Sequence, residues 1–284
     1  MNGIVIIDKE SDMTSRDVVD RVGKIFNTKK VGHTGTLDPL ATGVLVVCVN
    51  KATKLVDKIT ATKKEYIAEC VFGISTDTLD IEGNVLSSED AIISENKIID
   101  VLNSFKGVYN QEVPIYSAVK INGRKLYEYA RENIEVKLPS REVKIYDIIL
   151  LDKPTYKDNH TYITFKVKVS KGTYIRSLIR DIANRLNTVG IMTNLRRVSQ
   201  GKFKIDDSVK LNDLKVDNLI PIKDILDVKK IELTNDIEKK VLNGASIKNI
   251  YNENEVLFMK DNKEIALYKI DDNNKKIMKI DKMF

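Results

Sequence analysis

The chain has 284 residues, of which 42% are hydrophobic and 31% are charged, and its formal net charge is +6. This composition is typical of a globular protein and excludes a disordered chain. No apolar run approaches the ~20 residues of a membrane span, and MNGIVIIDKE lacks the features of a signal peptide, so we expect a cytoplasmic protein. At roughly 150 residues per domain, the length predicts two domains.

The first elements lead to a glycine-rich loop. A short strand at residues 3–7 precedes a helix from about Ser15 to Phe26, with Ser15 or Thr14 as its cap. The loop GHTGTLDPLATG follows and runs into the apolar strand 44–49, which is typical of a strand buried on both faces. Pro39 keeps Asp38 out of helical conformation. The loop matches neither a P-loop nor a dinucleotide motif, and ordinary turns share its dipeptides.

The middle of the chain predicts alternating helices and strands. We expect a helix at 51–59, a strand at 63–73 with Tyr66 on its apolar side, and a helix at 90–105. The acidic segment 77–82 lacks the spacing of an EF-hand, and the two cysteines lack metal-site spacing, so we expect no metal. Strands at 142–151 and 161–170 precede a helix that opens near Gly172.

Two segments suit an RNA partner. In VPIYSAVKINGRKLYEYAR, a strand paired with a helix, tyrosines alternate with cations that include Lys120 and Arg124, and such side chains can stack on bases and meet phosphates. Tyrosines at helical spacing are also common in ordinary packing. Residues 163–204 hold ten Lys or Arg and a single acid, Asp181, which predicts a nucleic-acid surface. Residues 228–284 read as a small β-rich tail domain.

The loop around Asp38 closely resembles the active-site motif of the tRNA pseudouridine-55 synthases, with Asp38 at the position of their nucleophilic aspartate. Further segments resemble that family in order: KKEYIAE, STDTLDIEG, the tyrosine-rich segment, KGTYIRSLIRDIANRL and NLRRVSQGKFKI. The resemblance implies an α+β pseudouridine-synthase fold over residues 1–227, with a mixed, largely antiparallel sheet, flanking helices and a central cleft. It also implies a PUA-like RNA-binding domain over 228–284.

The resemblance assigns roles to single residues. It implies that Asp38, Tyr66 and Arg176 are catalytic, with Arg176 paired to the carboxylate and Tyr66 lying against the target base. The expected substrate-binding residues are His33, which fills the space that the base vacates, Tyr174, which supports Tyr66, Leu195 on the cleft floor, and Lys9, Lys120 and Arg124. The sequence departs from the family at Glu10, which follows Lys9 where the family has proline.

The implied activity is isomerisation of uridine 55 in the tRNA T loop to pseudouridine, by base flipping and aspartate-dependent cleavage and re-formation of the glycosidic bond. The reaction involves no redox change, so we expect no cofactor. An ionised Asp38 in a cleft needs a neighbouring cation, because burial disfavours a charged carboxylate. An arginine can hold it in a bidentate pair while staying charged. We expect tRNA as the partner, no required protein partner, and a monomer.

Three alternatives remain at this point. A two-carboxylate glycosidase fits less well, because we expect no second acid beside Asp38 in any of the family-like cleft segments. A non-catalytic RNA-binding or RNA-folding protein could use the same scaffold. An enzyme that modifies a uridine in ribosomal or messenger RNA would share the chemistry and differ in its recognition surface.

Overall fold

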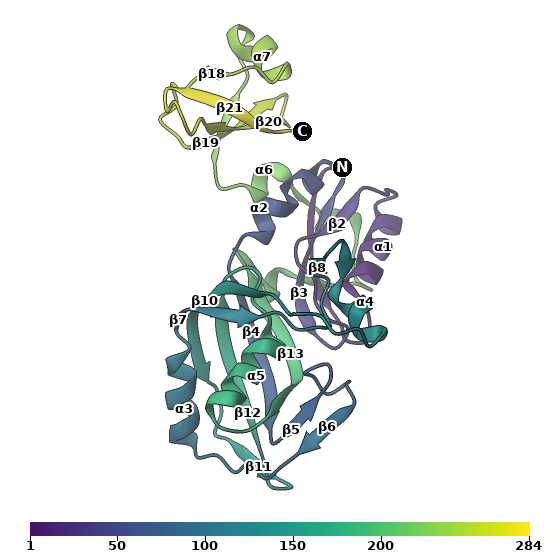
Figure 1. The fold of residues 1–284 in the computed structure, drawn as a ribbon. Coiled ribbons are helices and arrows are strands. Elements are labelled where there is room, and N and C mark those ends of the chain that lie inside the picture. Colours follow the sequence, from purple (N-terminus) through teal and green to yellow (C-terminus); the bar gives the residue numbers. More distant parts are fainter.

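A 12-stranded mixed sheet forms the centre of the molecule in the computed structural model, which describes all 284 residues (Figure 1). Its main strand order is β15-β1-β3-β13-β4-β12-β10-β7, and most neighbours are antiparallel. The predicted mixed, largely antiparallel sheet is therefore confirmed. The strands are β1 (Gly3–Lys9), β2 (Val31–His33), β3 (Thr42–Val49), β4 (Lys64–Phe72), β7 (Gly107–Glu112), β10 (Ser140–Leu150), β11 (Thr155–Lys157), β12 (His160–Val169), β13 (Gly190–Gln200), β14 (Phe203–Lys204), β15 (Val209–Lys210) and β16 (Ile220–Pro221).

Helices flank this sheet, and the first of them has a complete cap. Thr14 caps α1, since its hydroxyl accepts the Asp17 N–H at 3.1 Å while the Asp17 carboxylate accepts the Thr14 N–H at 2.8 Å. These two bonds satisfy backbone donors that the first turn leaves free. The helices are α1 (Ser15–Ile25), α2 (Val56–Thr60), α3 (Glu95–Ser104), α4 (Leu126–Arg131), α5 (Ile175–Arg185), α6 (Ile222–Ile225) and α7 (Asn235–Leu242), with 3-10 turns at Asn50–Leu55, Ile205–Asp207 and Val216–Asn218.

The large sheet is narrow in its middle, where β13 meets β3. These two strands pair in parallel at only two positions, Arg196 with Thr42 and Arg197 with Gly43. On one side of this junction lie β1, β2, β3 and α1, and on the other lie β4, β10, β12 and α5 (Figure 1). Gly43 has a φ of 98°, and a Cβ there would lie 2.2 Å from the Arg197 carbonyl oxygen. The junction therefore requires glycine at this position.

One apolar core of 35 buried residues covers the helix-facing side of the sheet. The amphipathic helix α5 contributes Leu178, Ile179 and Ile182, which pack beside Phe165 of β12. The apolar residues whose spacing predicted this helix from the sequence are therefore the residues that pack into the core. The sequence predicted its start near Gly172, three residues before the observed first residue, Ile175.

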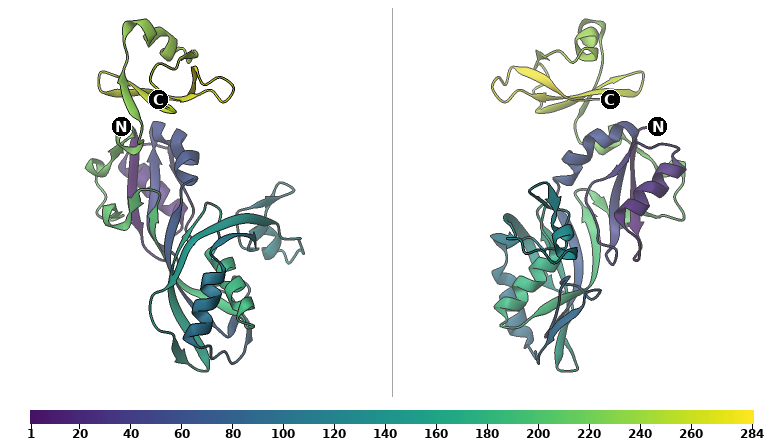
Figure 2. Two further views of the ribbon diagram at one scale, coloured as in Figure 1. Left: turned by 90° about the vertical axis from the view of Figure 1, so that its left-hand side faces the viewer. Right: turned by 45° about the vertical axis from the view of Figure 1, so that its right-hand side comes forward.

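A second sheet of five strands forms the C-terminal part and lies beside the end of the large sheet that holds the amino terminus (Figures 1 and 2). Along β19, Val256 and Phe258 face the core of this small sheet. Leu257 and Met259 point the other way and pack with Ile4 and neighbours of the large sheet. The predicted β-rich tail is confirmed. Its strands, in the order β17-β19-β20-β21-β18, are β17 (Lys229–Glu232), β18 (Ile247–Lys248), β19 (Glu255–Lys260), β20 (Lys263–Ile270) and β21 (Ile277–Met283).

Two segments differ from the sequence prediction. The tyrosine-rich segment contains no long strand, but a hairpin of β8 (Lys120–Ile121) and β9 (Arg124–Lys125) followed by the short α4. Pro114 explains part of this, because proline has no N–H for a strand ladder. The helix predicted at 90–105 starts only at Glu95, after the hairpin of β5 (Ile74–Thr76) and β6 (Val85–Ser88) and an extended connection. None of the helices is both long and apolar enough to cross a membrane.

Candidate active site

A cavity of about 260 Å³ opens at the junction of the two halves of the large sheet. Its wall combines the turn between β2 and β3, the start of β4, the residues that lead into α5, and β13. Of the nine residues that the sequence predicted for the site, five line this cavity: Asp38, Tyr66, Tyr174, Arg176 and Leu195. The fold thus brings together residues that are up to 157 positions apart in the chain.

Asp38 and Arg176 form an ion pair in the cavity wall. The Arg176 Nε lies 3.1 Å from the Asp38 carboxylate, whose side chain is 39% exposed, whereas the Arg176 side chain is 8% exposed. Two backbone carbonyls hold the other guanidinium nitrogens: Nη1 donates to Thr78 at 2.8 Å and Nη2 to Tyr116 at 3.0 Å. The arginine is thus fixed in place, and the carboxylate that it holds stays open to a ligand.

Asp80 is a second carboxylate at this arginine, and the sequence analysis missed it. It lies 3.3 Å from the Arg176 Nη1 with a side chain that is 7% exposed. Thr78 Oγ1 and the backbone N–H of Glu82 donate to its other oxygen, at 2.6 and 3.2 Å. The expectation that no second acid accompanies Asp38 is therefore wrong. Asp80 is outside the cavity wall, however, so the two acids do not flank a bond in the way a glycosidase requires.

Three tyrosines shape the cavity. Tyr66 projects from β4 and is 6% exposed, and Tyr116 and Tyr174 also line the cavity. Tyr174 is held by Gln111, which accepts its N–H at 2.8 Å and donates to its carbonyl at 3.0 Å. The Arg141 guanidinium lies 5.4 Å from the Tyr174 ring centre. Three tyrosines in the wall of one cavity suit a planar, neutral group such as a nucleobase.

Lys9 does not face the cavity, which corrects its predicted contact with substrate. Its side chain is fully buried, and its Nζ donates to the carbonyls of Glu10, Pro39 and Ala41 at 2.9, 3.1 and 2.7 Å. Two of these carbonyls belong to the turn that carries Asp38. Burial lowers the pKa of Lys9 to about 8, against the opposing effect of the nearby Asp38 charge. Lys9 therefore stabilises the Asp38 turn from the protein interior, through the Pro39 and Ala41 carbonyls.

Replacement of Lys9 by methionine is expected to destabilise the turn. The carbonyls of Pro39 and Ala41 would lose their donor, and a buried unsatisfied group costs about 1 to 3 kcal/mol, so we expect the free energy of unfolding to fall by about 2 kcal/mol. Urea denaturation checks this value. Lys210→Met is the control, since that lysine is 63% exposed and lies 3.9 Å from Glu10. Equal stability of the two variants would contradict the supporting role.

His33 stands next to the cavity and is absent from its wall. It ends β2, and its Nδ1 accepts the Gly35 N–H at 3.3 Å. Burial lowers the pKa of His33, with further contributions from the charges of Arg197 and Arg16. A neutral imidazole beside the turn is compatible with a role in propping a rearranged RNA strand.

Lys120 and Arg124 lie in the β8–β9 hairpin, away from the cavity wall. Lys120 is exposed. Arg124 pairs with Glu132 and lies 3.9 Å from Glu128, and its guanidinium carbon is 5.1 Å from the Tyr129 ring centre. Lys120 is therefore free to meet a phosphate, whereas Arg124 is engaged within its own segment.

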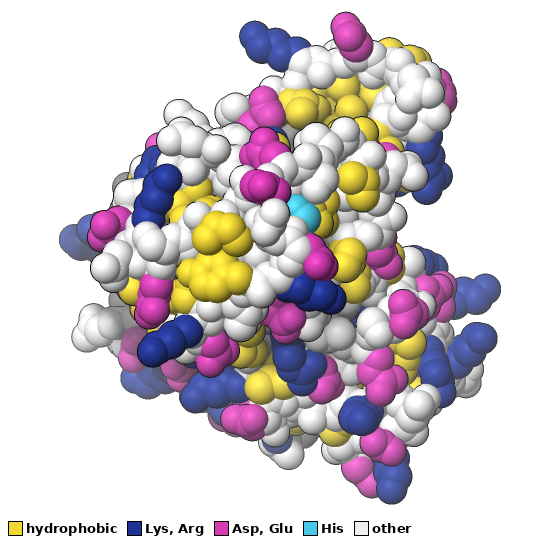
Figure 3. Space-filling model, turned by 90° about the horizontal axis from the view of Figure 1, so that it is seen from below, with side chains coloured by type: hydrophobic (Ala, Val, Ile, Leu, Met, Phe, Trp, Pro, Cys, Tyr) yellow, Lys and Arg dark blue, Asp and Glu magenta, His cyan; other side chains and the backbone are white.

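The basic segment 163–204 is only partly a surface. Arg176 pairs with Asp38, Arg180 with Glu112 and Asp181, and Arg196 with Asp8. Lys166 pairs with Glu65, and Arg197 is fully buried. Four of its ten cations are thus paired with acids, and a fifth is buried. Figure 3 shows a face of the molecule on which basic and acidic side chains are interleaved.

Lys64 is a buried cation in the cavity wall that the sequence analysis did not single out. It is 7% exposed, and its Nζ donates to the carbonyls of Thr60 and Thr62 at 2.9 and 3.2 Å. Burial, and then the charges of Arg197 and Lys171, lower the pKa of Lys64 from 10.5 to about 8. A lysine at the start of a half-buried strand gives no sequence signal for such a position.

This lowered pKa predicts how stability depends on pH. Between about 8 and 10.5 the unfolded chain holds the Lys64 proton and the folded protein releases it, so this contribution to stability rises with pH. We expect the wild type to gain free energy of unfolding relative to Lys64→Met when the pH is raised from about 7 to about 9.5. Urea denaturation at both pH values measures the difference, and a constant or shrinking gap would contradict the prediction.

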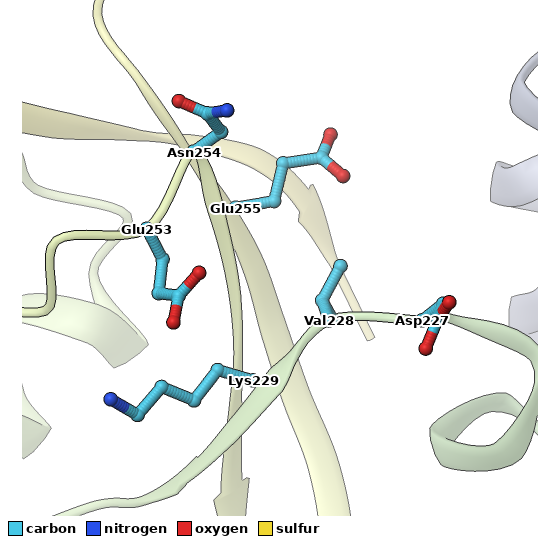
Figure 4. A pocket seen from close by; sticks show the side chains of 6 residues that line it. All are labelled: Asp227, Val228, Lys229, Glu253, Asn254 and Glu255. Carbon is cyan, nitrogen blue, oxygen red and sulfur yellow. The ribbon is translucent and has the colours of Figure 1, made fainter.

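A second hollow lies where α6 leads into the C-terminal sheet (Figure 4). Its lining holds three acids, Asp227, Glu253 and Glu255, and one cation, Lys229. This acidic lining is poorly suited to a polyanion such as RNA. No group of three or more His, Cys, Asp or Glu side chains in the structure is arranged to hold a metal ion. This hollow is therefore a poorer candidate for an RNA site than the cavity at Asp38.

Comparison with known families shows which family the chain matches. The model described as "TruB family pseudouridylate synthase (N terminal domain)" matches residues 23–175, and "tRNA pseudouridylate synthase B C-terminal domain" matches 176–227. A protein of Clostridium kluyveri named tRNA pseudouridine synthase B is 46% identical, over 87% of this chain and 86% of its own. One of Caldicellulosiruptor saccharolyticus with the same name is 45% identical, over 94% and 87%.

Solved structures give the same picture of the fold. A chain of an H/ACA RNP bound to a substrate RNA containing 2′-deoxyuridine is 25% identical, with a TM-score of 0.71, and the match covers 99% of this chain and 84% of that one. A chain of a Cbf5-Nop10-Gar1 complex is 28% identical, with a TM-score of 0.67, and the match covers 94% and 78%. The predicted pseudouridine-synthase fold with a PUA-like C-terminal part is confirmed.

Proposed function

Since this chain belongs to the TruB family of pseudouridylate synthases, we propose that it isomerises a uridine of tRNA to pseudouridine, and that the target is uridine 55 of the T loop. The observation that carries this function is the partly exposed Asp38 carboxylate, fixed by Arg176 at the mouth of a cavity with aromatic walls. A carboxylate in this setting can serve as a nucleophile or stabilise a developing cation.

The residues around Asp38 take complementary roles in this proposal. Arg176 keeps the carboxylate ionised, because a guanidinium keeps its charge when buried. The target base leaves its stack at a cost of a few kcal/mol, and stacking on one aromatic side chain returns about 1 to 3 kcal/mol. Tyr66 provides that surface and lies where it can help to remove the proton from carbon 5. Tyr174 supports it, and Leu195 forms the floor beneath the base.

The substrate contacts extend beyond the cavity. His33 fills the space that the flipped base vacates, and the exposed Lys120 meets a phosphate of the RNA strand. Arg124 contributes to this contact only if the RNA displaces its pairing with Glu132. We place the domain boundary after residue 227, where the second family match ends and the small sheet is about to begin. Residues 228–284 then provide a further RNA-binding surface. The enzyme acts in the cytoplasm as a monomer on tRNA and requires no protein partner or cofactor.

Release of tritium from carbon 5 tests this function. The isomerisation replaces the C5–H bond of uridine with the new glycosidic bond, so each turnover on tRNA labelled at carbon 5 releases one proton to water. We expect catalytic release without added metal or cofactor. Tight, salt-dependent RNA binding without tritium release would instead favour a non-catalytic RNA-binding protein.

A further inference from the structure

Arg197 is the largest fully buried side chain in the structure, and it has no carboxylate partner. Its Nε donates to the Val44 carbonyl at 2.6 Å, and its Nη2 donates to the Gly35 carbonyl at 3.0 Å. Its Nη1 is buried and has no acceptor. This arginine is therefore bound by backbone alone, which is unusual for a buried charge.

The two carbonyls that Arg197 holds flank the turn that carries Asp38: Gly35 lies at its start, and Val44 is the third residue of β3, into which the turn runs. Gly35 precedes the aspartate by three residues, and Val44 follows it by six. Lys9 holds the middle of the same turn through Pro39 and Ala41. Two cations, from β1 and β13, thus fix the turn at four carbonyls, and the carboxylate is left to pair with Arg176.

Arg197 also lies where the two halves of the sheet meet. Its backbone pairs with Gly43 of β3 and with Tyr66 of β4, so one residue adjoins both the turn and the tyrosine of the cavity. Arg197 itself is part of the cavity wall. Any movement of its side chain would be passed directly to the ends of the Asp38 turn.

A purely structural role does not explain a charge at this position. An apolar side chain of similar length would fill the space without the cost of desolvating a guanidinium. The positive charge acts on the surroundings of the turn, since Arg197 contributes to the lowered pKa of Lys9, Lys64 and His33. The guanidinium therefore provides two things that an apolar side chain cannot. It donates hydrogen bonds to the Gly35 and Val44 carbonyls, and it places a positive charge next to the turn.

We propose that Arg197 is a positioning residue, which holds the Asp38 turn at both ends so that the carboxylate meets Arg176 and the bound uridine in a productive geometry. This inference rests on the proposed function. It concerns the chemical step, because Arg197 lies buried in the cavity wall and does not reach the outer surface that the rest of the RNA would contact.

Single-turnover kinetics at saturating tRNA, together with the tRNA dissociation constant, test the proposal. In Arg197→Met we expect the rate to fall by about 100-fold, the effect of a displacement of about 1 Å at a reacting group, with the dissociation constant within about twofold of wild type. Arg197→Lys keeps the charge but has only one donor group for two separated carbonyls. Its single-turnover rate should therefore lie between the rates of wild type and Arg197→Met. In Arg197→Ala, added guanidinium ion should restore part of the rate, and methylammonium should not.

Arg196→Met is the matched control. It removes the same charge from the adjacent position of β13, but Arg196 pairs with Asp8 at 2.8 Å and its guanidinium contacts β3 only through the Thr42 hydroxyl at 3.3 Å. It holds neither the Gly35 carbonyl nor the Val44 carbonyl. Equal rates in Arg197→Met and Arg196→Met, or a wild-type rate in Arg197→Lys, would overturn the inference about Arg197. The proposed function would still stand in that case, provided that the wild-type protein forms pseudouridine. If Arg197→Met does not fold, the Lys variant and the guanidinium rescue decide. A wild type without product would overturn both proposals.

Discussion

Asp38→Asn is expected to lower pseudouridine formation by on the order of 10⁵-fold while tRNA binding stays within about twofold of wild type. The amide has the size of the carboxylate, and its oxygen can still accept from the Arg176 Nε that lies 3.1 Å away. It carries no charge and is a poor nucleophile, so it can neither attack nor stabilise a cation. Single-turnover tritium release and filter binding measure the two quantities.

Asp77→Asn is the control for this variant. Asp77 lies in the β5–β6 hairpin, where its carboxylate accepts the Asn84 N–H at 2.8 Å and takes no part in the cavity wall. We expect it to keep nearly normal turnover. Retained turnover in Asp38→Asn would remove Asp38 from its central role. A parallel loss of tRNA binding would indicate that the substitution disturbs the surface and not the chemistry.

Arg176→Lys is expected to lower the single-turnover rate by about 10² to 10³-fold, the range seen when one fixed donor is removed from a reacting charge. Arginine meets Asp38, Asp80 and the carbonyls of Thr78 and Tyr116 with three nitrogens at once. The single ammonium of lysine cannot span these four acceptors. Because the positive charge is retained, the loss of rate measures how much the reaction depends on the position of the Arg176 donors.

Arg180→Lys provides the comparison one turn further along α5. Arg180 pairs with Glu112 and Asp181, both at 2.9 Å, and does not line the cavity. We expect its turnover to remain close to that of wild type. Equal turnover in the two lysine variants would contradict a catalytic role for the pair of Asp38 and Arg176.

Local patterns in the sequence predicted much of the fold and the centre of the site. The apolar run of β3, the spacing of α5 and the Asp-Pro turn each depend on neighbouring residues, so they could be recognised without a structure. Resemblance to a family placed Tyr66, Tyr174 and Arg176 beside Asp38. The structure shows that these side chains line one cavity.

Long-range partners could not be predicted in this way. Asp80 was considered only as a possible metal ligand, because nothing in its own segment indicates that Arg176, 96 residues later, turns towards it. The resemblance placed Lys9 among the substrate-binding residues, and Arg197 was counted in the basic segment 163–204, yet both are fully buried against backbone carbonyls. Counting charges along a sequence cannot separate cations that face solvent from cations that bind inside the fold.

Mapping pseudouridine in an unmodified tRNA transcript tests the central claim most directly. The purified protein is incubated at substoichiometric concentration without metal or cofactor, and the product is read by carbodiimide treatment and primer extension. We expect one new stop, at position 55, that is absent with Asp38→Asn. A stop at another uridine would contradict the assigned target, and no stop with either protein would contradict the assignment of the Asp38 cavity as a pseudouridine-forming site.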